Sequence, residues 1–134
     1  MNADLTVNAD FEQLRSPADT LRKLCNQSGV PERIQGEVEL VLQELLTNLV
    51  EHAYENNPNG VIKIHFEVDS TNISIQSEDA GLEAAFNLDE VKMPDPLSLA
   101  EGGYGMAIIK SLMDDVSYRR LNGTNIWKLK KHYK

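Results

Sequence analysis

The feature that most constrains the fold of this chain is a long amphipathic stretch over residues 31–54. Apolar residues recur there at steps of three and four, which predicts a helix with one buried side. The residues of this stripe are Ile34, Val38, Val41, Leu42, Leu45, Leu49 and Ala53. Glu44, Asn48 and His52 lie beside the stripe at four-residue spacing, so a helix would point them roughly one way. A carboxylate one turn from an amide suits a general base next to an oxygen ligand for a divalent cation.

Strands are predicted on both sides of this helix. Residues 4–10 alternate weakly and predict an edge strand. Residues 62–68 alternate strictly between apolar and polar side chains, and residues 73–79 continue this pattern after a turn, so both strands should bury one face. The segment between Ser16 and Gly29 predicts another helix, with the serine as its N-cap and the glycine at its end.

The C-terminal part predicts an irregular segment, a helix and a hairpin. Residues 87–101 show no sustained period, and a loop of this length in a compact domain is usually a functional lid or a disordered segment. A third helix is predicted from Met106 to Val116, followed by a hairpin that turns at Asn122-Gly123. The whole order predicts an α+β fold, a two-layer sandwich whose helices cover one face of a mixed, mostly antiparallel sheet.

The length and charge of the chain limit the classes of function. Its 134 residues predict a single domain, and its net charge of −8 argues against a broad nucleic-acid-binding surface. The basic run over residues 128–134 is interpreted as a solvated terminus rather than a ligand patch. Cys25 is the only cysteine and lies among apolar residues, which predicts a packed thiol in a reducing compartment. Since no segment approaches 18 apolar residues, we expect a cytoplasmic protein without a membrane partner.

Two glycine-containing segments are candidates for ligand contacts. Gly102, Gly103 and Gly105 precede the third helix, where glycine lets backbone N–H groups approach an anion at a helix N-terminus. Glycines at that place equally suit the end of a loop that binds nothing. Asp79 and Gly81 end the second strand of the central hairpin. The carboxylate could accept a hydrogen bond from an exocyclic amine, but an ordinary turn explains the same two residues.

Together, these segments resemble the ATP-binding domain of the Bergerat-fold (GHKL) ATPase superfamily, and most of all its anti-sigma-factor serine/threonine kinase branch. Residues 44–54 are similar to the N box of that branch, and Asp79-Ala-Gly81 to its adenine-binding Asp-x-Gly segment. Residues 102–109 are similar to the glycine box that follows the ATP lid, and Gly123-Thr124 to the short Gly-Thr motif of the final strand. The resemblance covers nearly the whole of residues 1–134.

The resemblance implies how the triphosphate would be held. Glu44 would be the general base and Asn48 the ligand of Mg²⁺, whereas His52 suits either a phosphate contact or a capping position at the sheet edge. A lid would span about residues 87–104. The glycine-box residues that would surround the phosphates of ATP are Gly102, Gly103, Tyr104, Gly105 and Met106.

At the other end of the nucleotide, the resemblance implies that Asp79 binds the adenine amine, with Gly81 and Thr124 beside the base. The chain departs from the pattern of the family in two places. The second glycine of the usual Asp-x-Gly-x-Gly is missing, so the rim around the nucleotide is expected to have another shape. Glu101 stands where some kinases of the family have an arginine, and Lys92 is the alternative cation for the γ-phosphate.

The function implied by this resemblance is an ATP- and Mg²⁺-dependent serine protein kinase of a partner-switching regulatory system. It would phosphorylate a STAS-type anti-anti-sigma partner and sequester a sigma factor or another regulator. Kinases of this branch often form homodimers, although the sequence itself does not fix the oligomeric state. One alternative is a non-catalytic ATP-binding module whose nucleotide state only tunes the binding of partners. The other is an α+β scaffold without a nucleotide. The identity of the partner and of the pathway does not follow from the sequence.

Overall fold

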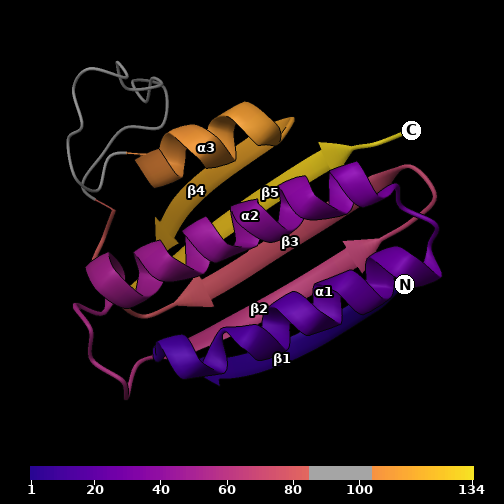
Figure 1. Ribbon diagram of the computed structural model, residues 1–134. Coiled ribbons are helices and arrows are strands. Elements are labelled where there is room, and N and C mark those ends of the chain that lie inside the picture. Colours follow the sequence, from indigo (N-terminus) through magenta and orange to yellow (C-terminus); the bar gives the residue numbers. More distant parts are fainter. Residues whose placement is uncertain (85–103) are drawn as a thin grey trace.

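The computed structural model describes residues 1–84 and 104–134 (Figure 1). Its strands are β1 (Asn2–Asn8), β2 (Val61–Val68), β3 (Asn72–Asp79), β4 (Asp115–Leu121) and β5 (Thr124–His132). Its helices are α1 (Arg15–Gln27), α2 (Glu32–Asn48) and α3 (Tyr104–Leu112), with a short 3₁₀ helix η1 (Phe11–Gln13) and a π-helical turn η2 (Leu49–Ala53). The predicted lid lies outside the described residues except for Tyr104, the first residue of α3.

The strands form one sheet in the order β1-β2-β3-β5-β4. Each pairing among these strands is antiparallel, so the prediction of a mostly antiparallel sheet is confirmed. The three α-helices lie on the same face of the sheet, with α1 over β1 and β2 and α3 next to β4 (Figure 1). The predicted α+β sandwich is confirmed, and the weakly alternating N-terminal segment is the edge strand β1.

The core forms where the apolar stripe of α2 and η2 faces the sheet. The stripe residues from Ile34 to Leu49 are buried as predicted, and Ala53 is half-buried at the end of η2. The sheet contributes the buried faces of β2 and β3, which are Ile62, Ile64, Phe66, Val68, Ile73 and Ile75. The same face of β3 then changes from apolar to polar, because Ser77 and Asp79 are also buried. This change marks the candidate site.

The N-terminus of α1 differs from the prediction. The helix begins at Arg15 with Leu14 at the N-cap position and no capping side chain, so Ser16 already lies inside the helix. The capping side chain is Asp10, whose Oδ1 accepts a hydrogen bond from Glu12 N at 3.1 Å at the start of η1. The prediction of Ser16 as the cap is wrong because η1 runs directly into α1, so the chain enters the helical region one turn earlier.

The end of α3 also differs from the prediction. The helix ends at Leu112, and Val116 belongs to β4. Asp114 N donates a hydrogen bond to Lys130 O at 2.9 Å, and the pairing of β4 with β5 begins at the next residue. The chain therefore leaves the helix because the sheet satisfies its backbone, although the apolar spacing continues.

The predicted chain reversals at glycines are confirmed. Gly29 ends α1 with a φ of +71°, a conformation that glycine adopts without strain. Asn122 and Gly123 join β4 to β5 with φ values of +51° and +79°. Positive φ at both central residues is typical of a two-residue type I′ hairpin turn.

The basic C-terminal run is not uniformly solvated. Lys128 and Lys130 are exposed, but the side chain of Lys131 is only 16% exposed. Strand alternation turns Lys131 toward the helices, together with Leu129 and Trp127. The interpretation of this run as a solvated terminus is therefore wrong for Lys131.

The single cysteine and the helices bear on two further expectations. Cys25 is buried as predicted, and burial raises the pKa of its thiol to about 11, so the thiolate is scarce at neutral pH. In the described part of the chain, no helix is both long enough and apolar enough to cross a membrane.

Candidate functional site

A buried carboxylate with one free oxygen lies at the end of β3. Asp79 is 3% exposed, and its Oδ1 accepts hydrogen bonds from Gly81 N at 3.0 Å and from Asn125 Nδ2 at 2.8 Å. Its Oδ2 is buried and has no hydrogen-bond partner within residues 1–84 and 104–134. Burial raises the pKa of Asp79, while Asn125, Gly81 and Arg120 act in the opposite direction. Because an unsatisfied buried oxygen destabilises the fold, Oδ2 indicates a ligand that donates a hydrogen bond.

A second unsatisfied oxygen lies on the same face of β3, two residues earlier. Ser77 is fully buried, and its Oγ has no hydrogen-bond partner among the described residues. Ser77 is not among the predicted site residues, although the two-residue spacing from Ile73 through Ile75 already places it on the buried face. Ser77 and Asp79 together offer two adjacent polar atoms at this end of the strand.

Gly81 brings the segment after Asp79 against the end of the long helix. A Cβ atom on Gly81 would lie 2.4 Å from Ala53 O, and Leu82 N donates a hydrogen bond to Ala53 O at 2.8 Å. The hydrogen bond from Gly81 N to Asp79 is also typical of an ordinary turn, so the turn and the site coexist. Only the close approach to Ala53 requires glycine, because backbone atoms cannot move aside for a methyl group as a flexible side chain can.

Asn125 is the centre of a polar network around Asp79. This residue is 1% exposed, and its Nδ2 donates hydrogen bonds to Asp79 Oδ1 and to Leu82 O, the latter at 2.9 Å. Its Oδ1 accepts hydrogen bonds from Tyr118 Oη at 2.6 Å and from Arg120 Nη1 at 2.8 Å. The groups around Nδ2 accept hydrogen bonds and the groups around Oδ1 donate them, so the network assigns which end of the amide is nitrogen and which is oxygen. The carboxylate of Asp79 is therefore fixed by a side chain that is itself fixed.

The network also holds the backbone that follows Asp79. Arg120 Nη1 donates a hydrogen bond to Gly81 O at 2.9 Å, and Tyr118 Oη accepts one from Ala84 N at 3.0 Å. Both side chains come from β4, the edge strand beside β5. The sheet edge thus fixes the segment that forms one wall of the candidate site.

Asn125, the residue after the Gly-Thr segment, joins Asp79 in this network, and Thr124 does not. Asn125 lies opposite Asp79 in the pairing of β3 with β5. Thr124 is the first residue of β5, is half-buried, and by strand alternation faces the other side of the sheet. Tyr118, Arg120 and Asn125 could not be predicted as site residues, because the sequence does not show that β5 pairs with β3 in this register.

At the other end of the site, the glycine box meets α2. A Cβ atom on Gly105 would lie 2.8 Å from Glu44 Oε2 and 3.3 Å from Asn48 Nδ2, and both of these side chains are half-buried. The structure therefore brings these three predicted residues together. Gly105 lies in the first turn of α3, where backbone N–H groups and the helix dipole favour an anion.

His52 does not join Glu44 and Asn48. Its side chain is 66% exposed, and its Nε2 lies 4.0 Å from Glu51 Oε2. The expectation that it points the same way assumed α-helical spacing up to residue 54. The π-helical turn η2 joins residues five apart, as in the hydrogen bond from Tyr54 N to Leu49 O, and this rotates His52 out of line.

Of the other predicted glycine-box residues, Tyr104 and Met106 lie in α3. Met106 is buried in the core at 7% exposure. Tyr104 is the first residue of α3. Gly102 and Gly103 lie outside the described residues, as do Lys92 and Glu101.

Two segments that are distant in sequence meet the helical run of α2 and η2. Gly105 contacts it at Glu44 and Asn48, and Gly81 contacts it at Ala53, five residues after Asn48. One end thus offers a buried acceptor, and the other a helix N-terminus beside a carboxylate and an amide. This arrangement suits a ligand with a hydrogen-bond donor on a ring and an anionic tail, which is the chemistry of a purine nucleotide.

The comparisons with known proteins agree with this geometry. The chain matches the family model described as a histidine kinase-like ATPase domain over residues 7–131. The serine-protein kinase RsbW of Oceanobacillus iheyensis is 30% identical over 136 aligned residues, which cover 89% of this chain and 85% of the relative. The serine-protein kinase RsbW of Staphylococcus aureus is 31% identical over 134 aligned residues, with 87% and 84% covered.

Two solved structures share the fold. The structure of the RsbU and RsbW domains of Rv1364c from Mycobacterium tuberculosis has a TM-score of 0.69 and 17% identity, and the match covers 98% of this chain but 31% of that one. The SiaB–SiaC complex from Pseudomonas aeruginosa has a TM-score of 0.67 and 10% identity, with 97% of this chain and 89% of that chain covered. These two likenesses concern the fold alone. From the family model and the curated relatives it follows that the chain belongs to the histidine kinase-like ATPase domain family, within its branch of serine-protein kinases.

Proposed function

We propose that this protein is an ATP- and Mg²⁺-dependent kinase of a partner-switching system. It phosphorylates a serine of a STAS-type anti-anti-sigma partner and sequesters a sigma factor or another regulator according to the state of that partner. The observation that carries the proposal is the buried Oδ2 of Asp79, which has no partner among the described residues. It lies two residues before Gly81, which contacts the same helical run that brings Glu44 and Asn48 to Gly105. A purine and a triphosphate fit these two ends.

The adenine amine donates a hydrogen bond to Asp79 Oδ2. This oxygen is buried and has no partner in the described part of the chain, whereas Oδ1 accepts hydrogen bonds from Gly81 N and from Asn125. An acceptor at this place favours adenine, because guanine presents a carbonyl oxygen where adenine presents an amine. Gly81 leaves room beside the base, and Asn125 holds the carboxylate in position.

The phosphates lie at the N-terminus of α3. Asn48 is the residue that would hold Mg²⁺, since its amide oxygen is a suitable ligand for a cation that keeps water and phosphate oxygens around it. The fit is supported by the half-buried placement of Asn48 against Gly105, next to the carboxylate of Glu44. The cation would neutralise phosphate charge, and the first turn of α3 adds a favourable field.

Phosphoryl transfer then depends mainly on position. The serine Oγ of the partner attacks the γ-phosphorus, the bond from that phosphorus to the bridging oxygen breaks, and ADP leaves with the electron pair. Glu44 accepts the proton of the attacking hydroxyl. Holding the two reactants in line accounts for most of the acceleration.

Phosphorylation switches the partner through charge. A phosphoserine adds about −1.5 to −2 charges at neutral pH. The kinase itself has a net charge of −8, so the product is repelled from its surface and the kinase becomes free to bind the regulator. The relatives named serine-protein kinase support serine as the target. A homodimer in the cytoplasm belongs to the same proposal.

The test is transfer of label from γ-labelled ATP to a serine-bearing STAS-domain partner from the same source. We expect labelling by the wild type and a loss of about 100-fold or more in Glu44→Gln, with ATP affinity nearly unchanged. Glu51→Gln, which changes an exposed carboxylate in η2, is the matched control and should label normally. Undiminished labelling by Glu44→Gln contradicts the role of Glu44. ATP binding without transfer by the wild type favours the alternative, a module whose nucleotide only tunes partner binding.

A further inference from the structure

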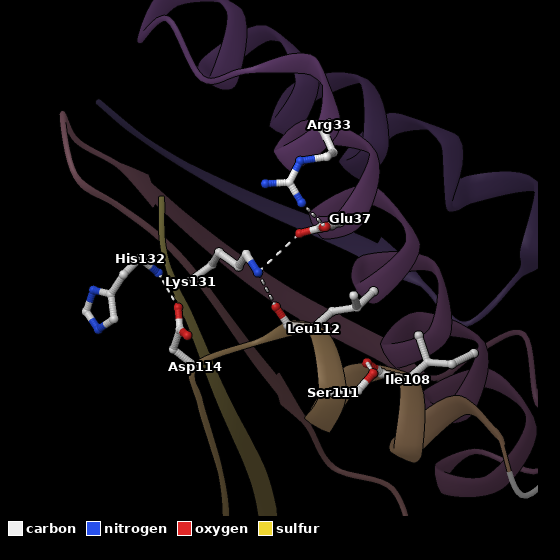
Figure 2. Close-up of polar contacts among 8 residues, drawn as sticks. All are labelled: Arg33, Glu37, Ile108, Ser111, Leu112, Asp114, Lys131 and His132. Atoms are coloured by element: carbon white, nitrogen blue, oxygen red, sulfur yellow. Dashed lines mark hydrogen bonds and ion pairs between the residues drawn. The ribbon is translucent and has the colours of Figure 1, made fainter. Parts of the chain in front are cut away.

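Lys131 occupies a core-facing position near the end of β5. Its Nζ donates a hydrogen bond to Leu112 O at 2.6 Å and lies 3.1 Å from Glu37 Oε2, so the side chain bridges α3 and α2 (Figure 2). The side chains of Lys131 and Glu37 are 16% and 21% exposed. Glu37 Oε2 is a buried atom, and Lys131 supplies its counter-charge. A cation at a helix C-terminus is also favoured by the helix dipole.

Two contacts hold α3 along α2, one at each end of α3. Gly105, in the first turn, packs against Glu44, and Leu112, the last residue, is tied to Glu37 through Lys131. Gly105 and Leu112 are seven residues apart in α3, and Glu37 and Glu44 are seven residues apart in α2. Seven residues make two helical turns, or about 10 Å. The two helices therefore run antiparallel with matching spacing, and the Lys131 contact and the candidate site lie at opposite ends of one rigid element.

Strand β5 holds the same end of α3 through the backbone. Asp114 N donates a hydrogen bond to Lys130 O at 2.9 Å. Asp114 Oδ2 accepts one from His132 N at 2.6 Å, which Figure 2 shows. These bonds fix the point where the chain leaves the helix. Lys131, between the two residues of β5 that make them, connects this fixed point to α2.

We infer that Lys131 is a positioning residue for the phosphate end of the nucleotide site. With Glu37 it sets the register of α3 along α2, and thereby the distance of Gly105 from Glu44 and Asn48. The inference rests on the proposed function, in which that contact surrounds the phosphates. Loss of Lys131 affects the phosphate end selectively, because Asp79 at the base end is held by the network of β4 and β5.

The test compares the affinities of ATP and AMP, each with Mg²⁺, for the full chain and its variants by isothermal titration calorimetry. Lys131→Met keeps the length of the side chain and removes the ammonium group. It is expected to weaken ATP binding about tenfold, because a displaced first turn of α3 loses part of its contact with the phosphates. AMP, which lacks the β- and γ-phosphates, is expected to change by less than about twofold. Lys131→Arg keeps the cation and should bind both nucleotides like the wild type. Lys130→Met, on the exposed face of the same strand, is the matched control and should change neither affinity.

The outcomes separate this inference from the proposed function. A folded Lys131→Met variant that binds ATP normally, or that loses ATP and AMP affinity equally, overturns the inference and leaves the proposed function standing. If circular dichroism shows that this variant is unfolded, Glu37→Gln decides, because it removes the ion pair with Lys131 while Lys131 still bonds to Leu112. The variant also removes the pair of Glu37 with Arg33, an exposed side chain within α2, so Arg33→Met is measured beside it and should leave ATP affinity unchanged. A selective loss of ATP affinity in Glu37→Gln supports the inference, and unchanged ATP affinity overturns it. A wild type that binds no ATP overturns the proposed function and this inference with it.

Discussion

Asp79 combines a buried carboxylate with hydrogen bonds that satisfy only one of its oxygens. The sequence marks this residue by its place at the end of an alternating strand, and Glu44 and Asn48 by their spacing on a helix. It does not mark Asn125, because an asparagine after a hairpin turn is ordinary until the partner strand is known. The residues that we propose to touch the nucleotide were thus predictable, whereas the residue that orients Asp79 was not.

We predict that Asp79→Asn changes how the stability of the unliganded protein depends on pH. Burial raises the pKa of Asp79 in the folded state above its ordinary value of 3.8. The stabilising contribution of the protonated form is therefore complete below 3.8 and is lost as the pH rises through the raised folded pKa. Asparagine does not titrate, so the stability of the variant relative to the wild type should increase across this window.

Denaturant unfolding of both proteins between about pH 3.5 and pH 7 measures this difference. Glu78→Gln, at the neighbouring position on the other face of β3, is the control and should show no such trend. A difference between Asp79→Asn and the wild type that stays constant or decreases with pH would contradict the buried state of Asp79.

Gly105→Ala is predicted to reduce phosphoryl transfer at least tenfold with little loss of stability. The added Cβ would meet Glu44 Oε2 at 2.8 Å, and this atom is the end of a flexible side chain, so the proposed base moves and the fold stays. Gly36→Ala is the matched control, because the space around Gly36 is open and alanine is favoured inside α2 by about 1 kcal/mol. Transfer assays and thermal unfolding test the pair. Equal transfer by both variants would show that the Gly105–Glu44 contact does not matter for the reaction.

Secondary-structure elements were predictable where periodicity determines them, and their ends were not. The stripe of α2 and the alternation of β2 and β3 carry their own signal because each element buries one face. The π-helical form of η2 and the end of α3 depend on tertiary partners. The contacts of Lys131 also depend on tertiary structure. In the sequence it is one lysine of a basic run, and only the packing of β5 against α2 and α3 shows that it contacts both helices.

The attachment of the edge strand β1 to β2 is predicted to weaken as the pH rises through neutrality. His65 Nδ1 lies 2.7 Å from Asp4 Oδ1, opposite it in the strand pairing. The hydrogen bond to Asp4 raises the pKa of His65 above 6.5, burial opposes this rise, and Glu67 adds to it. The stabilising charge pair is therefore complete below pH 6.5 and is lost as the pH rises through the raised folded value.

Hydrogen exchange of the β1 amides, corrected for intrinsic rates, measures this attachment. Protection should fall across that pH range in the wild type and show no step in His65→Gln. The change should be small, because the His65 side chain is 35% exposed and the pair is screened by solvent. A step that persists in His65→Gln would assign the effect to another group.

At the scale of the whole molecule, the fold places the segments around Gly81 and Gly105 along the helical run of α2 and η2. The strand order β1-β2-β3-β5-β4 puts the last strand of the chain beside β3, which brings Asn125 to Asp79. The sequence predicted the number and the order of these elements, but neither this neighbour relation nor its register. The proposed nucleotide site is a property of that topology, since it combines Asp79 and Asn125 from two strands with Glu44, Asn48 and Gly105 from two helices.

The most direct test of the central claim is a titration of the amide resonances with a non-hydrolysable ATP analogue and Mg²⁺, followed by NMR. One nucleotide that spans both ends predicts that the resonances of Gly81 and Gly105 shift together with a single dissociation constant. Shifts at only one of these glycines, or at the two with different constants, would contradict a shared site.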